Sequence, residues 1–246
     1  MRPLLIALQF LTRLPVRLAE PPQARELGHS VLCYPLVGLA LGLLLAAAAW
    51  GLGGIPVTLG AALLLLFWVL LTGALHLDGL ADSIDAWAGG RGERARTLEL
   101  MKDPRSGPMG VTALVMLLLV KYAALTTVLG QGRDAVLVLA PLLGRALLLL
   151  LFLTTPYVRS GGLGALPAAH LPWEMAVAIL AVTAVAVAAL AGADGWRALV
   201  AAMIVFVLAR AAMRRCLGGT TGDTAGALVE ISEASILIAV AAFPPR

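Results

Sequence analysis

An acidic cluster directly follows an apolar run in the first third of the chain. It holds Asp78, Asp82 and Asp85, with His76 at its start. If this segment continues the preceding run as a helix, the three carboxylates fall on one face, because successive residues rotate by about 100°. Carboxylates so close repel one another unless a cation lies between them. Because Mg²⁺ prefers hard oxygen ligands, the cluster predicts a magnesium site, and simple surface exposure is the alternative.

A second acidic cluster opens the last apolar run. Residues 218–233 contain Asp223, Glu230 and Glu233, interleaved with glycines. Carboxylates at the end of a membrane span are costly to bury, so they indicate function. We expect Asp223 to complete the metal site of the first cluster. A reacting hydroxyl could then pass its proton to Glu230, Asp85 or His76, and the sequence does not choose between them.

Glycines in the second cluster could bring backbone N–H groups close to a phosphate. Gly222 lies where a helix is expected to start, and the positive end of a helix favours an anion. The segment is not a Walker A loop, because the Gly-Lys-Ser/Thr ending is missing. Close packing of small residues between membrane helices explains the glycines equally well.

Basic residues lie near the acidic clusters as well. Lys102 and Arg105 fall on a turn between two apolar runs, with Asp103 between them. A Lys and an Arg there suit a pyrophosphate that a metal holds on one side and cations hold on the other. Arg145 lies inside an apolar run and needs an anionic partner, either an acid of this chain or a substrate.

The elements that position these residues are apolar helices. Of 246 residues, 61% are hydrophobic and 13% are charged, which is more apolar and less charged than a soluble domain. Several runs approach the ~20 residues that a helix needs to cross a bilayer. We predict an all-α, polytopic transmembrane bundle forming a single domain over residues 1–246. About seven spans are expected, near residues 31–50, 57–75, 109–129, 135–155, 174–192, 196–213 and 227–243.

The basic residues fall mainly in alternate connections between these spans. The positive-inside rule therefore predicts a cytoplasmic N-terminus, with residues 1–30 as an interfacial segment. Both acidic clusters then open toward the cytoplasm. Topology accounts for the net charge of +4, so we expect the lipid bilayer as a partner and no nucleic acid.

Separate pieces of the chain resemble the cobalamin synthase family, the adenosylcobinamide-GDP ribazoletransferases. They are residues 10–15, 76–85, 101–107, 144–145 and 218–233, in order along nearly the whole chain. Pro104 and Met109 depart from the family's pattern. These departures concern the fine shape of one loop and not the reaction.

The resemblance implies a multi-pass enzyme of the bacterial inner membrane that uses Mg²⁺ late in cobalamin biosynthesis. Its substrates would be adenosylcobinamide-GDP and α-ribazole, or α-ribazole 5′-phosphate, and GMP would be released. A homo-oligomer, or association with other corrinoid enzymes, is also expected. The matching pieces imply a set of residues that bind substrate or phosphate: Arg13, Lys102, Asp103, Arg105, Arg145, Gly222 and Glu233.

Two other functions fit the same residues. The first cluster looks like a variant of the CDP-alcohol phosphotransferase motif, with Asp82 where that motif has Arg, so a lipid synthase is one alternative. A cation- or proton-coupled transporter is the other. A transporter favours acids at both membrane faces, whereas here they gather on one side.

Overall fold

The computed structural model describes residues 1–159 and 161–243. Within these ranges the chain is helical, and its only β-type pairing is an isolated bridge between Tyr157 and Thr220. This confirms the predicted all-α fold. The helices are α1 (Arg2–Leu11), α2 (Ala24–Val31), α3 (Tyr34–Gly51), α4 (Val57–Thr72), α5 (Leu75–Gly90), α6 (Arg94–Leu100), α7 (Pro108–Gly130), α8 (Ala135–Thr154), α9 (Ala165–Ala169), α10 (Trp173–Leu190), α11 (Gly192–Leu217) and α12 (Gly222–Ala241).

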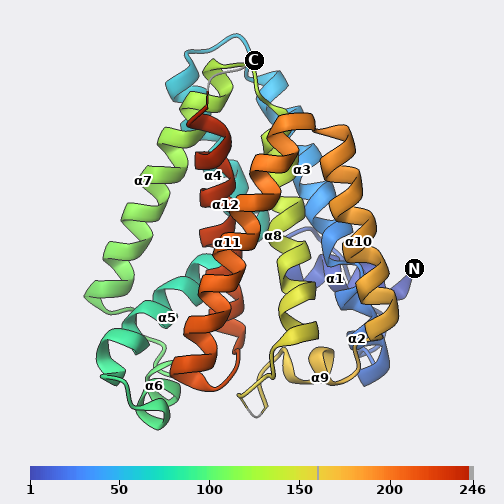
Figure 1. The fold of residues 1–246 in the computed structure, drawn as a ribbon, viewed down its shortest axis with the longest axis vertical. Helices are drawn as coiled ribbons and strands as arrows, with labels where there is room; N and C mark the ends of the chain where they lie inside the picture. Colours follow the sequence, from blue (N-terminus) through green and yellow to red (C-terminus); the bar gives the residue numbers. More distant parts are fainter. Residues whose placement is uncertain (160, 244–246) are drawn as a thin grey trace.

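Six of these helices are long and apolar enough to cross a membrane, namely α3, α7, α8, α10, α11 and α12. The count rises to seven if α4 and α5 together form one broken span. Each begins and ends within a few residues of a predicted span, because the length of the apolar runs sets both. Figure 1 shows the bundle that they form. The predicted polytopic bundle is therefore confirmed.

The first acidic cluster does not continue the second predicted span. Helix α4 ends at Thr72, α5 begins at Leu75, and the two are bent by 87°. Gly73 and Ala74 between them have φ angles of 61° and 59°. This left-handed conformation ends a helix, and Gly adopts it readily. The expectation of one continuous helix was wrong. Helix α5 instead runs obliquely across the lower end of the bundle in Figure 1.

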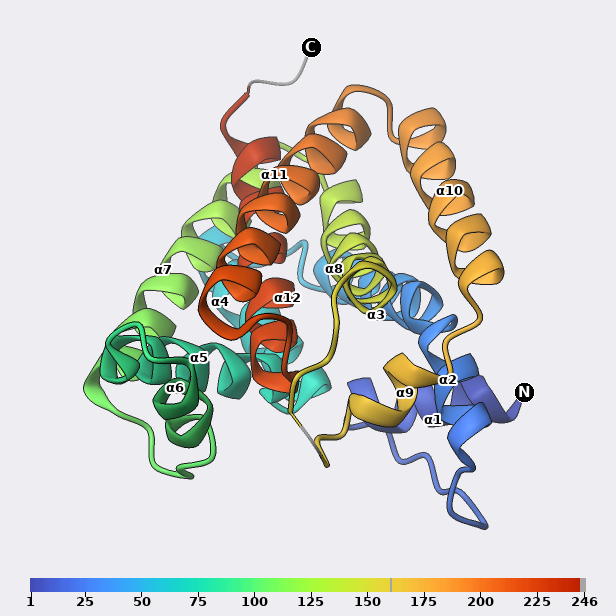
Figure 2. The ribbon, with the colours of Figure 1, turned by 60° about the horizontal axis from the view of Figure 1, so that its bottom comes forward.

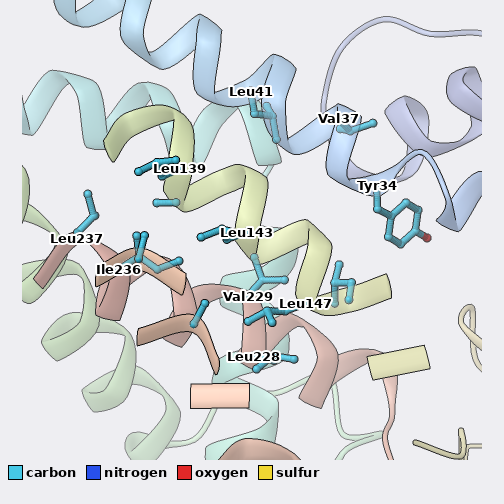
Figure 3. Close-up of a cluster of buried hydrophobic side chains, with 14 of the residues drawn as sticks. Tyr34, Val37, Leu41, Leu139, Leu143, Leu147, Leu228, Val229, Ile236 and Leu237 are labelled. Carbon is cyan, nitrogen blue, oxygen red and sulfur yellow. The ribbon is translucent and has the colours of Figure 1, made fainter. Parts of the chain in front are cut away.

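Helices α8 and α12 occupy the centre of the bundle and pack against each other, and α8 also packs against α3. Their backbones approach closely: a Cβ added to Gly38 of α3 would lie 2.4 Å from the carbonyl oxygen of Pro141 in α8. Small residues permit such contact between membrane helices. Figure 3 shows the buried side chains of the three helices meeting in one cluster. They include Val37, Leu41, Leu139, Leu143, Leu147, Leu228, Val229, Ile236 and Leu237.

One end of the bundle gathers the segments that matter for chemistry. In Figure 2, α5 and α6 lie on one side of this end and α1, α2 and α9 on the other. The α8–α9 and α11–α12 connections run between them and are joined by backbone hydrogen bonds. The Thr220 N–H donates to the Pro156 carbonyl and the Val158 N–H donates to the Thr220 carbonyl, both at 2.9 Å. This pairing fixes the start of α12 beside the end of α8.

Candidate functional site

The two acidic clusters meet where α5 packs on α12. A Cβ on Gly79 would lie 2.7 Å from the carbonyl oxygen of Asp223, and one on Gly226 would lie 3.2 Å from the Cα of His76. Only small residues allow this approach. It brings Asp78 and Asp223 to the wall of one cavity. Carboxylates from distant stretches therefore converge, and Gly226 serves helix packing.

Asp82 lies among the other acids of this junction. Partial burial is the largest of the effects that raise its pKa from 3.8 to about 6. Three neighbouring carboxylates add to the shift, those of Asp78, Asp223 and Asp85, whereas the positive charge of Arg159 opposes it. Mutual repulsion of this kind is what a bound cation would relieve.

Arg159 is a site residue that sequence reasoning missed. Its Nη1 donates a hydrogen bond to Asp223 Oδ2 at 2.8 Å. The backbone pairing between Tyr157 and Thr220 brings the two side chains together. Residues 64 positions apart carry no local signal of such a contact. The pair places a positive charge beside the aspartates of this junction.

The donor types at this junction suit Mg²⁺, which prefers carboxylate oxygens. Asp78, Asp82 and Asp223 supply such oxygens at one place. As the side chains stand, the described part of the chain holds no group of three or more His, Cys, Asp or Glu residues arranged around a metal position. Ligation by Asp223 would compete with its ion pair to Arg159. The carboxylate oxygens are of the type that Mg²⁺ binds. In this structure their side chains do not yet surround a common point, so binding the ion would require them to turn toward one another.

Asp85 is turned away from this junction and toward the loop before α7. Its Oδ2 accepts a hydrogen bond from the Gly107 N–H at 2.6 Å, and its Oδ1 accepts one from the Gly110 N–H at 2.9 Å. A Cβ on either glycine would collide with this carboxylate. Asp85 therefore anchors the loop that carries Lys102 and Arg105, and its expected role as a metal ligand or base stays a prediction.

The predicted phosphate-binding residues outside the helices lie at the same end. Lys102 is exposed, and Arg105 donates from Nε and Nη2 to the two carboxylate oxygens of Asp103 at 2.9 and 2.8 Å. These hydrogen bonds lower the pKa of Asp103 to about 2. The Arg13 side chain lies against Gly73, so it supports the bend between α4 and α5.

Three further predicted residues lie inside the bundle, in a buried ionic network. Lys121 Nζ donates to Glu230 Oε2 at 2.8 Å and to Glu233 Oε2 at 2.7 Å. Arg145 pairs with the same Glu233. Lys121, Arg145, Glu230 and Glu233 are each at most 5% exposed. The two positive charges balance the two negative ones, and a buried charge is costly unless it is paired in this way. Lys121 was not among the predicted site residues, although a Lys inside an apolar run is itself a signal.

His76 connects this network to the cavity. Arg145 Nη2 lies 3.4 Å from His76 Nδ1. Burial, and then the charges of Arg145 and Lys121, lower the pKa of His76 well below 6.5, so the ring is neutral. When Nδ1 accepts from the guanidinium, Nε2 carries the proton.

One cavity adjoins the aspartates, and a second cavity shares part of its wall with the first. The first, of about 200 Å³, has Asp78, Asp223 and Gly222 on one side and mainly apolar side chains on the other. The second, of about 440 Å³, lies under α1, α2 and α9. A Cβ on Gly222 would lie 3.7 Å from the hydroxyl oxygen of Tyr157, an ordinary contact, so the surroundings of this glycine do not themselves require Gly, and its role in phosphate binding stays a prediction.

Known proteins match the chain along nearly its whole length. The model of the cobalamin-5-phosphate synthase family matches residues 3–241. A protein of Stutzerimonas stutzeri (strain A1501) called adenosylcobinamide-GDP ribazoletransferase is 60% identical, with 98% of each chain covered. Proteins of the same name from Pseudomonas fluorescens (strain Pf0-1) and Pseudomonas aeruginosa (strain PAO1) are 56% and 54% identical. These matches cover 99% and 98% of this chain, and 100% and 98% of the relatives. No solved structure is a significant match.

Proposed function

The chain belongs to the cobalamin-5-phosphate synthase family, and we propose that it joins adenosylcobinamide-GDP to α-ribazole, or to its 5′-phosphate, with release of GMP. The observation that carries this proposal is the convergence of Asp78, Asp82 and Asp223 beside a cavity at one end of the bundle. A phosphoryl transfer needs a place where anionic oxygens are positioned and neutralised. Neither the lipid synthase nor the transporter is favoured by the relatives.

The bond changes define what the site must do. A ribose hydroxyl of the ribazole attacks the phosphorus attached to the cobinamide arm. The new P–O bond forms as the bond to the bridging oxygen breaks, and that oxygen leaves on GMP. The hydroxyl proton passes to water or to a neighbouring carboxylate. Positioning and charge stabilisation supply most of the acceleration in such transfers.

The residues of this chain divide that task. Asp78, Asp82 and Asp223 would hold Mg²⁺, which supplies neutralisation of the pyrophosphate charge when bound. Arg159 and Lys102 would contact the phosphate oxygens from other directions, and a guanidinium suits two such oxygens at once. Asp85 keeps the Lys102 loop against α5. His76 would donate a hydrogen bond at the cavity wall.

The same proposal includes location. A multi-pass protein in the bacterial inner membrane, with a cytoplasmic N-terminus, would open its aspartates to the cytoplasm, because the basic connections lie on that side. Nucleotides and Mg²⁺ are plentiful there. A homo-oligomer, or association with other corrinoid enzymes, stays a prediction.

The test is a GMP-release assay on the purified full chain in lipid nanodiscs. GMP should appear only when adenosylcobinamide-GDP, α-ribazole and Mg²⁺ are all present, and EDTA should stop it. Asp82→Ala should abolish release, whereas Asp134→Ala should not, because Asp134 is an exposed carboxylate that precedes α8. CDP-diacylglycerol is tested in parallel. Transfer from that lipid alone would contradict the proposal, and undiminished release in EDTA would contradict the metal assignment.

A further inference from the structure

An apolar groove leads away from the aspartates. The two cavities share three lining residues, Phe10, Tyr34 and Leu163, and we call their junction the aromatic groove. The rings of Phe10 and Tyr34 have centroids 6.3 Å apart and planes inclined by only 19°. A path therefore runs from the carboxylates Asp78 and Asp223 to a pair of nearly parallel aromatic rings.

Three separate segments build the groove. Phe10 lies in the last turn of α1, Tyr34 is the first residue of α3, and Leu163 lies in the connection between α8 and α9. Tyr34 is 2% exposed, and Figure 3 shows it at the edge of the core cluster with its hydroxyl pointing away from α8 and α12. Phe10 is 39% exposed, so its ring has a face that the protein does not cover.

We propose that the aromatic groove binds the flat, apolar base of the nucleoside acceptor and directs its ribose toward Asp78 and Asp223. This inference rests on the proposed transferase function. It follows from continuity, because the acceptor must present a hydroxyl beside the aspartates while the rest of the molecule lies within reach. Aromatic side chains bind flat rings by stacking.

The polarity of the walls decides between the two bases that the reaction involves. The guanine of the donor has polar atoms along its edges, and each would need a partner once buried. Beyond the residues shared with the first cavity, the second cavity offers two polar side chains, Gln9 and Ser30. The Ser30 hydroxyl already donates to the Leu27 carbonyl at 2.7 Å. Such walls suit a base with few polar atoms, which describes the benzimidazole type better than guanine.

The volumes agree with a ligand of this size. The cavity beside the aspartates measures about 200 Å³ and the adjoining one about 440 Å³, and small-molecule sites commonly occupy roughly 300–1,000 Å³. The groove thus has room for a bicyclic base at the junction and a ribose nearer the carboxylates.

Phe10→Ala tests the inference, because Phe10 is partly exposed and its truncation leaves the buried core intact. Loss of one stacking ring should raise the KM for α-ribazole about tenfold, while the KM for adenosylcobinamide-GDP changes less than about twofold. Phe10→Tyr keeps the ring and should restore the wild-type KM. Trp50→Ala, an aromatic truncation at a residue that is 87% exposed near the end of α3, is the matched control and should change neither.

A direct binding measurement separates this inference from the proposed function. The fluorescence of α-ribazole alone should report binding to the wild-type full chain and weaker binding to Phe10→Ala, without any turnover. Ribosides of benzimidazole should bind the wild type better than the riboside of adenine, and Phe10→Ala should lose that preference.

The contrary outcomes differ in meaning. A Phe10→Ala change confined to the KM of adenosylcobinamide-GDP would assign the groove to the donor and overturn the inference. An unchanged α-ribazole affinity in Phe10→Ala, with wild-type GMP release intact, would overturn it as well. Absence of GMP release from the wild type would instead contradict the proposed function.

Discussion

The two hydrogen bonds that Asp85 accepts from Gly107 and Gly110, which we call the Asp85 clamp, give a prediction with a magnitude. Asp85→Asn keeps one carbonyl oxygen but turns an NH₂ group toward the other backbone N–H, so one of the two hydrogen bonds to Gly107 and Gly110 is lost. Hydrogen bonds to a charged acceptor contribute about 1.5–3 kcal/mol each. Because Asp85 is only half-buried, we take the lower part of that range, and expect about 2 kcal/mol in all.

That loss should be visible as opening of the loop between α6 and α7. A cost of about 2 kcal/mol raises the open population roughly 30-fold. Proteolysis of a transiently open segment follows that population when reclosing is fast. Trypsin should therefore cleave after Arg105 about 30-fold faster in Asp85→Asn, measured by mass spectrometry on protein in detergent micelles.

The matched control is Asp78→Asn, which removes the same charge from the exposed surface of the same helix. It should leave the cleavage rate unchanged. If Asp85→Asn were cleaved at the wild-type rate, the clamp would not hold the loop, and Asp85 would return to being a candidate ligand. Loss of GMP release alone would not distinguish these roles, because both predict it.

Three other predictions follow from the same structure. In EDTA the free energy of unfolding should fall as pH rises from about 4 to about 6, because folded Asp82 binds its proton more tightly than the unfolded chain does; thermal unfolding should show this fall in the wild type and a smaller fall in Asp82→Asn, because burial raises the pKa of Asp223 too, and Mg²⁺ should reduce it. Lys121→Met should cost about 3–5 kcal/mol of stability, because it leaves the buried carboxylate of Glu230 without its cation, while Glu233 keeps Arg145; exposed Lys102→Met should change the melting temperature little. Gly79→Ala should lower GMP release at least about tenfold, because its Cβ would lie 2.7 Å from backbone, whereas Gly60→Ala, with nothing closer than 3.9 Å, should retain activity.

The membrane spans were predictable because bilayer thickness dictates them. The convergence of Asp78, Asp82 and Asp223 was also predictable, because charges at span ends on one side have few other places to lie. The bend after Thr72 was not, since it depends on Ala74 in a left-handed conformation that Ala seldom adopts. Gly73 indicates that a left-handed residue could end the helix there, but nothing in the sequence indicates that Ala74 is left-handed as well.

The partners of the charged residues were less predictable than their positions. Glu230 and Glu233 read as catalytic or substrate-binding because they follow Asp223 in the same segment. A helix that begins at Gly222 carries them about two and three turns into the bundle, and Lys121 meets them there from α7. Such pairing depends on how helices pack, which no local spacing encodes.

The small volume beside the aspartates has a consequence for what the enzyme can discriminate. About 200 Å³ is less than a drug-sized molecule commonly occupies, so the corrin macrocycle must remain outside the enclosed space, with only its phosphorylated side arm entering. The protein then has little means to inspect the cobalt, its upper axial group or the ring's amide periphery. We expect corrinoids altered at those positions to serve as donors almost as well as the natural one, with selection concentrated on the incoming nucleoside.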